Sequence, residues 1–238
     1  MEDLIYPRCY HPKDLWKQIE IINQFIPVET DENFIKIAME ACLPDGAEAL
    51  FVIPKLRSNY TRATSEALKI IEEKRRFHCH VEIKRKKFCR EEKTIKCLDI
   101  LSRAQKDAGD IIIIPAQFGA RHLGRSVNLV RKKMASNEFG LGAYEVAWML
   151  ITHNERENVI NKVHMDCPGD TYSAIYSPYF DYVQKWMEFA ARESKRSVYD
   201  TGSVTGFLTN GRRVQYFSLF NFYCKIIIWQ RRNIMHTK

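Results

Sequence analysis

The sequence lacks the cysteine pattern of a secreted protein, because none of its cysteines forms a CxxC pair and their number, seven, is odd. This usage is typical of reduced thiols and argues against a disulfide framework. The first residues also lack an apolar segment, and Glu2 and Asp3 are acidic, so no signal peptide is evident. We therefore expect a cytoplasmic protein. The cysteines are Cys9, Cys42, Cys79, Cys89, Cys97, Cys167 and Cys224.

Long hydrophobic runs are missing as well. The most apolar stretch near the C-terminal end, residues 214–229, is interrupted by Gln215, Ser218, Asn221 and Lys225. A transmembrane helix needs about 20 mostly apolar residues, so this stretch is too short and too polar to predict one. A terminal strand pair, an anchor at a membrane surface and a segment added to a complete domain all stay open for it.

Acidic residues are fewer than basic ones, with 29 Asp and Glu against 37 Lys and Arg and a formal net charge of +8. This excess favours an anionic partner such as nucleic acid, a nucleotide or anionic lipid. Runs of like charge can equally be solvated faces without a ligand. The composition, 45% hydrophobic and 28% charged over 238 residues, is that of a globular chain long enough to bury a core.

The spacing of apolar residues predicts alternating strands and helices. The predicted helices cover residues 12–23, 61–76, 90–107, 127–134, 143–151 and 179–190. The predicted strands cover residues 49–54, 77–83, 110–115 and 161–166.

Four successive isoleucines at 111–114 are the clearest strand signal. They are β-branched and apolar on both faces, as in the middle of a covered parallel sheet, and a proline at 115 marks the expected end of the strand. We therefore predict an α/β fold with a mostly parallel sheet covered by helices. It forms a single main domain over residues 1–209, followed by a basic aromatic extension over 210–238. Ligands in such folds usually bind at the carboxyl ends of the strands.

The segment QFGARHLGRS, residues 117–126, follows this strand and leads into a predicted helix. It matches the phosphate-loop pattern G-x-x-x-x-G-K-S except that arginine replaces lysine. Arginine does not imitate the compact lysine ammonium, and no N-K-x-D sequence follows, so a P-loop NTPase is not predicted. A phosphate-binding loop and a structural turn with solvated arginines stay open. The phosphate-binding candidates are Gly119, Arg121, His122, Gly124, Arg125 and Ser126.

A second constellation lies in VHMDCPGD, which contains His164, Asp166, Cys167 and Asp170. Asp166 and Asp170 could hold a divalent metal ion, with His164 as an acid or base, as a hydrolase or nuclease requires. The same residues are also good turn formers. No histidine partner can be assigned to Cys167, which weakens its case as a nucleophile.

A zinc site is a further alternative near the middle of the chain. His78 and His80, on one face of a predicted strand, could join Cys89 or Cys97 at zinc. Their spacing is not that of paired zinc ligands. Histidines on the surface of a sheet are the other interpretation.

The stretches PAQFGARHLGRSV, NEFGLGAYEVAWMLITHNER and DCPGDTYS together resemble a set of uncharacterised bacterial proteins over roughly the middle third of the chain. The resemblance implies no function, because none is attached to that set. Chains of the set end near a stretch like GSVTGFLTN, whereas this chain continues past Asn210. The resemblance therefore favours an extension added to the fold.

Three functions are compatible with these patterns. The first is binding of a phosphorylated ligand, nucleic acid or nucleotide, through the loop at 117–126. The second is a metal-dependent hydrolase or nuclease-like enzyme that uses Asp166 and Asp170. The third is a non-catalytic interaction protein whose tail, residues 210–238, contacts a partner or a membrane surface.

Overall fold

The computed structural model describes residues 12–84, 87–154, 164–183 and 186–209. The helices in these ranges are α1 (Leu15–Asn23), α2 (Glu32–Met39), α3 (Tyr60–Lys74), α4 (Glu92–Ala104), α5 (Val127–Lys133) and α6 (Ala143–Thr152), with short 3-10 turns η1 (Lys106–Ala108) and η2 (Ala120–His122). The strands are β1 (Ala49–Pro54), β2 (Phe77–Cys79), β3 (Phe88–Arg90), β4 (Ile111–Gln117), β5 (Glu138–Gly140), β6 (His164–Asp166), β7 (Asp170–Tyr172), β8 (Tyr176–Val183), β9 (Trp186–Glu193), β10 (Thr201–Ser203) and β11 (Thr205–Phe207).

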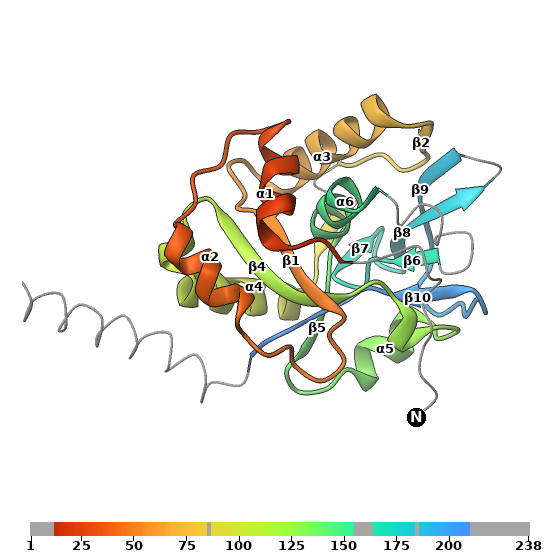
Figure 1. The fold of residues 1–238 in the computed structure, drawn as a ribbon. Coiled ribbons are helices and arrows are strands. Elements are labelled where there is room, and N and C mark those ends of the chain that lie inside the picture. The colour runs from red at the N-terminus through yellow and green to blue at the C-terminus, as the bar shows by residue number, and fades with distance from the viewer. Residues whose placement is uncertain (1–11, 85–86, 155–163, 184–185, 210–238) are drawn as a thin grey trace, which may run out of the picture. The chain divides into compact units, whose positions relative to one another are not determined.

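Sheet A has the strand order β1-β4-β11-β5, and all its neighbours are antiparallel. Ala49 lies opposite Ala116, and Pro54 lies opposite Ile111. Strand β11 comes from the end of the described chain and inserts between β4 and β5. Figure 1 shows helix α1 in front of this sheet and α4 behind it.

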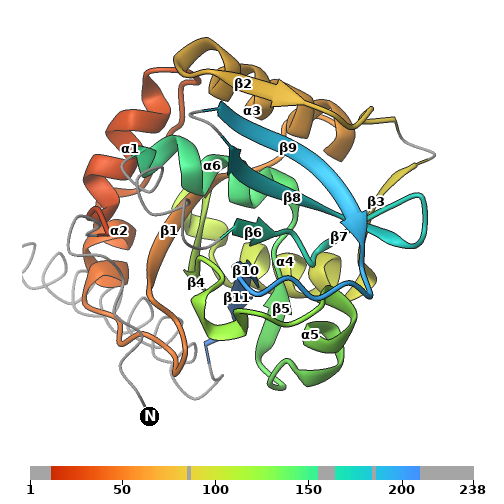
Figure 2. The same cartoon turned by 90° about the vertical axis from the view of Figure 1, so that its right-hand side faces the viewer.

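Sheet B follows the order β10-β6-β8-β7-β3, with β9 alongside β8 and β2 alongside β9 (Figure 2). The pairs β10/β6 and β2/β9 are parallel, and the other pairs are antiparallel. The longest pairing joins β8 to β9, so that Tyr179 lies opposite Ala190 and Val183 lies opposite Trp186.

The prediction of a mostly parallel sheet is wrong, because β4 pairs antiparallel with both of its neighbours. The isoleucines of β4 do indicate a covered strand, since α1 and α6 contact β1 while α4 contacts β4. A continuous apolar run reports that both faces are covered and says nothing of the direction of the neighbouring strands. Antiparallel pairing also places the loops after β1 and β4 at opposite ends of the sheet, so these strands do not share a carboxyl edge.

The predicted helix over 179–190 is also wrong, because these residues belong to β8 and β9. Aromatic residues such as Tyr179 and Trp186 fit a pleated, half-buried surface well. The spacing that suggested one helical stripe instead produces cross-strand pairs, Tyr179 with Ala190 and Val183 with Trp186. These residues therefore lie close together because β8 and β9 pair as antiparallel strands.

The other predicted helices and strands are confirmed within the described residues, with ends that shift by a few positions. Side chains of Asp14, Asp31 and Asn59 accept backbone hydrogen bonds at the starts of α1, α2 and α3. All ten residues of α6 are buried, and the helix packs against α1, α3 and β1. Among the described helices, none has the length and apolar composition that crossing a bilayer requires.

The described chain up to Leu208 belongs to one compact unit. The predicted extension, residues 210–238, lies outside the described residues, and so does the apolar stretch 214–229. The hypotheses of an anchor or a partner-binding tail therefore stay predictions.

Candidate functional site

The loop after β4 turns on two glycines with positive φ, Gly119 at +106° and Gly124 at +73°. Gly119 lies directly against Gly202, and a Cβ atom added to Gly119 would be 2.8 Å from the Gly202 carbonyl oxygen. Strand β4 continues through Pro115 to Gln117, so the prediction that it ends at the proline is wrong. Only one residue separates the strand from Gly119, and the two glycines have clear structural roles.

The backbone amides of this loop already have acceptors within the protein. The amide of Gly119 donates to Gln117 Oε1 at 2.6 Å, and that of Gly124 donates to the Thr201 carbonyl oxygen at 2.9 Å. The amide of Arg125 donates to the His122 carbonyl oxygen at 3.2 Å, and Ser126 Oγ caps α5. Phosphate binding by the loop stays a prediction, and its support comes from the arginine side chains.

His122 is buried beneath the loop, where its Nε2 atom lies 2.7 Å from Glu138 Oε1. Thr205 Oγ1 donates to the same carboxylate oxygen at 2.6 Å, and Gln117 Nε2 donates to Thr205 Oγ1 at 2.8 Å. Burial raises the pKa of Glu138, but the hydrogen bonds from His122 and Thr205 outweigh it and lower the pKa to about 2. Arg121 Nε also lies 3.5 Å from Glu138 Oε1. His122 and Arg121 are therefore held by one buried carboxylate.

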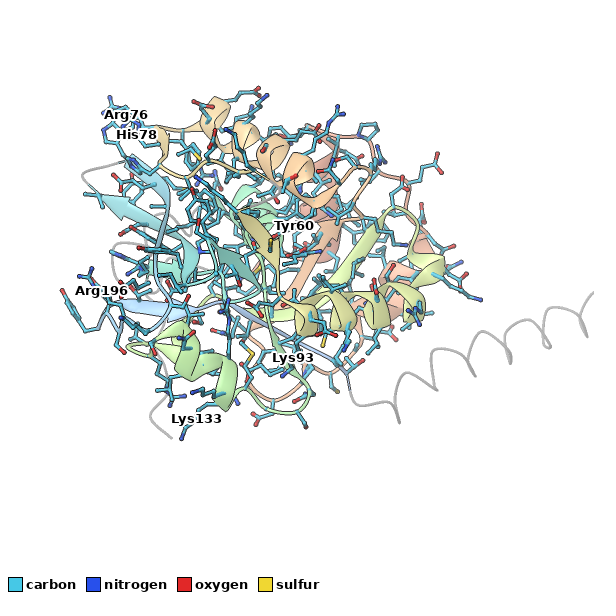
Figure 3. All side chains as sticks on the ribbon, turned by 180° about the vertical axis from the view of Figure 1, so that it is seen from behind. Tyr60, Arg76, His78, Lys93, Lys133 and Arg196 are labelled. Carbon is cyan, nitrogen blue, oxygen red and sulfur yellow. The ribbon has the colours of Figure 1, made fainter. Side chains whose placement is uncertain are left out.

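Arg125 is exposed and lies on a surface formed by two segments. The start of α5 packs against residues 194–201, where the Asn128 amide donates to the Ser194 carbonyl oxygen at 2.9 Å. Figure 3 shows Lys133 and Arg196 projecting outward on the same side of the molecule. We define the basic face as the exposed side chains of Arg125, Lys132, Lys133, Lys195, Arg196 and Tyr199.

The positive charge of the basic face is a local concentration, because residues 1–209 as a whole carry little net charge. Six of the 37 Lys and Arg, and none of the 29 Asp and Glu, lie in residues 210–238. Residues 1–209 therefore carry 31 basic and 29 acidic residues and are close to neutral. Glu193 lies within the same region and pairs with Lys195 at 3.3 Å. The other cations of the face form no ion pair with a carboxylate of the described residues.

The residues of the second constellation separate into different contacts. His164 Nδ1 lies 2.7 Å from Asp181 Oδ1, whereas Asp166 Oδ1 lies 3.5 Å from Arg192 Nε. Residues 167–169 form the turn that the sequence predicts. Burial raises the pKa of Asp166 to about 7, although Arg192 lowers it. In the part of the chain that the structure describes, no group of three or more His, Cys, Asp or Glu is arranged to hold a metal ion.

Asp170 belongs to a buried charge cluster that the sequence did not predict. Its Oδ2 atom accepts hydrogen bonds from the Tyr60 hydroxyl and the Ala143 amide, both at 2.6 Å. Arg90 lies 4.0 Å above the centre of the Tyr60 ring and forms an ion pair with Glu145. Burial raises the pKa of Asp170 to about 7, although Arg90 and the Tyr60 hydroxyl lower it.

One signal for this cluster was present in the sequence. Glu145 is the single charged residue of α6, a helix that is apolar on all its faces. A carboxylate in such a helix is buried and needs a cation. Its partner, Arg90, is 55 residues away along the chain, and no local pattern connects the two.

The proposed zinc ligands are distributed over several elements. His78 stacks on Trp186, with ring centroids 4.2 Å apart, while Cys89 is exposed on β3 and Cys97 is buried on α4. Within the described ranges these side chains do not come together in a group that could hold a metal ion. His78 and His80 are exposed on β2 and next to it, as the alternative interpretation expects.

No family model, curated protein or solved structure matches this chain. The resemblance of the middle third to a set of uncharacterised bacterial proteins stays a prediction. The function is therefore argued from the geometry of the described residues.

Proposed function

We propose that this protein binds single-stranded nucleic acid through the basic face. The observation that carries the proposal is Tyr199, which is 85% exposed beside the cations of the face. An exposed aromatic ring offers a stacking surface for an unpaired base, and neighbouring Lys and Arg side chains contact the phosphates. The loop that first suggested phosphate binding contributes Arg125 to this surface.

The arrangement favours a strand over a single nucleotide. Arg125 lies just before α5 and Lys133 is the last residue of α5. Arg196 and Tyr199 come from the neighbouring segment 194–201. Cations spread over such a surface suit successive phosphates, while a compact nucleotide site depends on converging backbone amides. The loop amides of Gly119, Gly124 and Arg125 donate to acceptors within the protein.

The experiment measures fluorescence anisotropy of a labelled oligothymidylate and of a duplex of equal length, with the full chain, at several salt concentrations. The variants are Tyr199→Ala and the double variant Arg125→Ala/Arg196→Ala. The matched control removes two exposed lysines of α2 and α3, Lys36→Ala/Lys69→Ala.

We expect Tyr199→Ala to weaken single-strand binding by about 1–3 kcal/mol with little change in its salt dependence. The arginine variant should reduce the slope of log K against log salt by about 0.7 for each phosphate that it no longer neutralises. The lysine control should bind like the wild type. Equal affinities and slopes for all four proteins would refute the proposal, because binding would then not involve the basic face. Preference for the duplex would contradict base stacking on Tyr199.

A further inference from the structure

Exposed apolar side chains gather at segment 194–201, which links β9 to β10. Among the described residues, ten large hydrophobic side chains are exposed, and four of them belong to this segment or adjoin it. They are Leu123 and Leu129, each 40% exposed, Ile175 at 60% and Tyr199 at 85%. Single apolar side chains are normal on a protein surface, but several at one place indicate a contact surface. We call these four residues the apolar set.

Ile175 and Leu129 adjoin the segment at Ser194. The Ser194 amide donates to the Ile175 carbonyl oxygen at 2.9 Å. The Ser194 carbonyl oxygen accepts from the Asn128 amide, also at 2.9 Å, and Asn128 precedes Leu129 in α5. Leu129 and Lys133 are four residues apart in α5, so their side chains share one face of the helix.

Leu123 and Tyr199 adjoin the same surface at Gly124. The Gly124 amide donates to the Thr201 carbonyl oxygen at 2.9 Å. A Cβ atom added to Gly124 would lie 3.7 Å from the Tyr199 carbonyl oxygen, and Leu123 is the residue before Gly124. The apolar set therefore lies among the cations of the basic face.

The turn that presents Ile175 has a strained backbone. Ser173 and Ala174 have φ values of +48° and +65°, and in the described part of the chain no other non-glycine residue has a positive φ. Residues with side chains rarely adopt this conformation, and such strain is concentrated at functional sites. The strained turn ends in an isoleucine that is exposed, which supports a role for its side chain in a contact.

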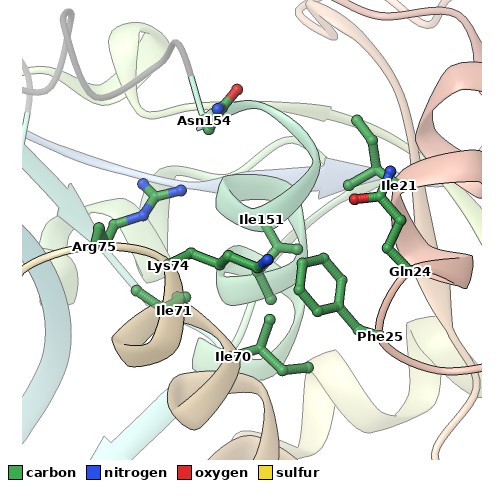
Figure 4. Close-up of a pocket in the computed structure, with 9 residues that line it drawn as sticks. All are labelled: Ile21, Gln24, Phe25, Ile70, Ile71, Lys74, Arg75, Ile151 and Asn154. Carbon is green, nitrogen blue, oxygen red and sulfur yellow. The ribbon is translucent and has the colours of Figure 1, made fainter.

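A hollow between α1, α3 and α6 shows the opposite arrangement of apolar side chains. Its volume is about 280 Å³, and Figure 4 shows Phe25, Ile70 and Ile151 converging in it. A partner must insert a group into such a hollow to reach these side chains. The apolar set is instead exposed at the surface, where a partner without a matching protrusion can contact it.

The basic face keeps an excess of positive charge around the apolar set. Glu193 pairs with Lys195 at 3.3 Å, and Asp200 Oδ2 lies 4.0 Å from His164 Nε2. The four other cations of the basic face form no ion pair within the described residues. The surface therefore combines unpaired cations with exposed aliphatic side chains.

This combination suits an anionic lipid bilayer. A nucleic-acid strand uses the cations and the Tyr199 ring, but aliphatic side chains neither neutralise phosphates nor stack on bases. In a bilayer, anionic headgroups attract the cations, and the boundary between headgroups and acyl chains receives the aliphatic side chains.

We propose that this surface binds anionic lipid membranes, with Leu129 and Ile175 entering the boundary between headgroups and acyl chains. The inference goes beyond the proposed function, because these two side chains have no part in binding nucleic acid. Membrane and nucleic acid share the cations of the basic face, so the two ligands should compete.

The test is co-sedimentation of the full chain with vesicles of phosphatidylcholine alone and of phosphatidylcholine mixed with phosphatidylglycerol. The variant is Leu129→Ser/Ile175→Ser, with folding verified by circular dichroism. The matched control, Ile95→Ser/Ile100→Ser, replaces two exposed isoleucines of α4. All three proteins have the same charge and contain residues 210–238, so a difference between them reports the aliphatic contact.

We expect the wild type and the control to bind the vesicles with phosphatidylglycerol and not those of phosphatidylcholine alone. The Leu129→Ser/Ile175→Ser variant should bind the anionic vesicles about tenfold more weakly, because it buries less aliphatic surface. It should bind oligothymidylate like the wild type, which separates failure of this inference from failure of the proposed function. Equal vesicle binding by variant and wild type, equal binding to both kinds of vesicle, or no binding to anionic vesicles would each overturn the proposal.

Discussion

Gly119 and Gly202 contact each other so closely that neither has room for a side chain. Gly119→Ala adds a Cβ atom to a residue with positive φ, and this atom would lie 2.8 Å from the Gly202 carbonyl oxygen. Gly124→Ala also adds a Cβ atom to a residue with positive φ, but the nearest atom is 3.7 Å away, so there is no clash. We expect Gly124→Ala to lower the free energy of unfolding by about 1–2 kcal/mol. Gly119→Ala should cost about 1–3 kcal/mol more. Equilibrium urea unfolding measures both, and equal effects would contradict the importance of the glycine contact.

Arg90 and Glu145 form a buried ion pair, so removing either side chain alone should destabilise the protein strongly. Arg90→Met leaves a buried carboxylate without its cation and should lower the free energy of unfolding by about 3–5 kcal/mol. The double variant Arg90→Met/Glu145→Gln should recover much of this stability, because glutamine is neutral and can still accept from the Gly142 amide. Thermal unfolding of the wild type, both single variants and the double variant measures the coupling. Additive effects would show that the two side chains do not interact.

At the scale of elements, local sequence patterns predicted which helices and strands are present better than they predicted which strands pair and in which direction. The apolar spacing within α3, α4 and α6 and the isoleucines of β4 identify these elements, because periodicity is a property of neighbouring residues. The direction of β1 against β4, and the place of β11 between β4 and β5, depend on residues far apart in sequence. The same is true of the candidate site. A local sequence motif indicates Arg125, whereas Tyr199 is brought close to it only by tertiary contacts.

Strand β7 begins with a buried carboxylate, Asp170, whose protonation should affect stability. Because the pKa of Asp170 is raised to about 7 in the fold, the folded state binds more protons than the unfolded state between about pH 4 and 7. Its favourable contribution is complete below pH 4 and is lost as the pH rises towards 7. Asp170→Asn should therefore gain stability relative to the wild type across this interval, by a few kcal/mol at about 1.4 kcal/mol per pKa unit.

Asp110→Asn is the matched control for this measurement. A hydrogen bond from the Glu29 amide, together with Arg57, holds the pKa of Asp110 below its usual value. Its contribution is lost only as the pH falls below about 4, so between pH 4 and 7 the Asp110→Asn curve should stay nearly parallel to that of the wild type. Urea unfolding at pH 4, 5.5 and 7 tests both, and an Asp170→Asn curve parallel to that of the wild type would contradict the raised pKa.

For the whole molecule, the burial of each cysteine should determine how fast its thiol reacts. Cys42, Cys79 and Cys89 are exposed, whereas Cys97 and Cys167 are buried. Burial raises the pKa of Cys167 well above its usual value, which further suppresses the reactive thiolate. We expect iodoacetamide to modify the first three in the native full chain and the other two only in urea. Peptide mass spectrometry measures this, and rapid native labelling of Cys167 would contradict a closed core.

The position of β11 has a consequence for the order of events during synthesis. Residues 205–207 complete sheet A between β4 and β5, although these two strands are made much earlier. A ribosome adds about 5–20 residues per second, so β4 must wait several seconds for its inner neighbour. During that interval the nascent chain presents an open strand edge, a natural point of contact for a chaperone and of mispairing between nascent chains.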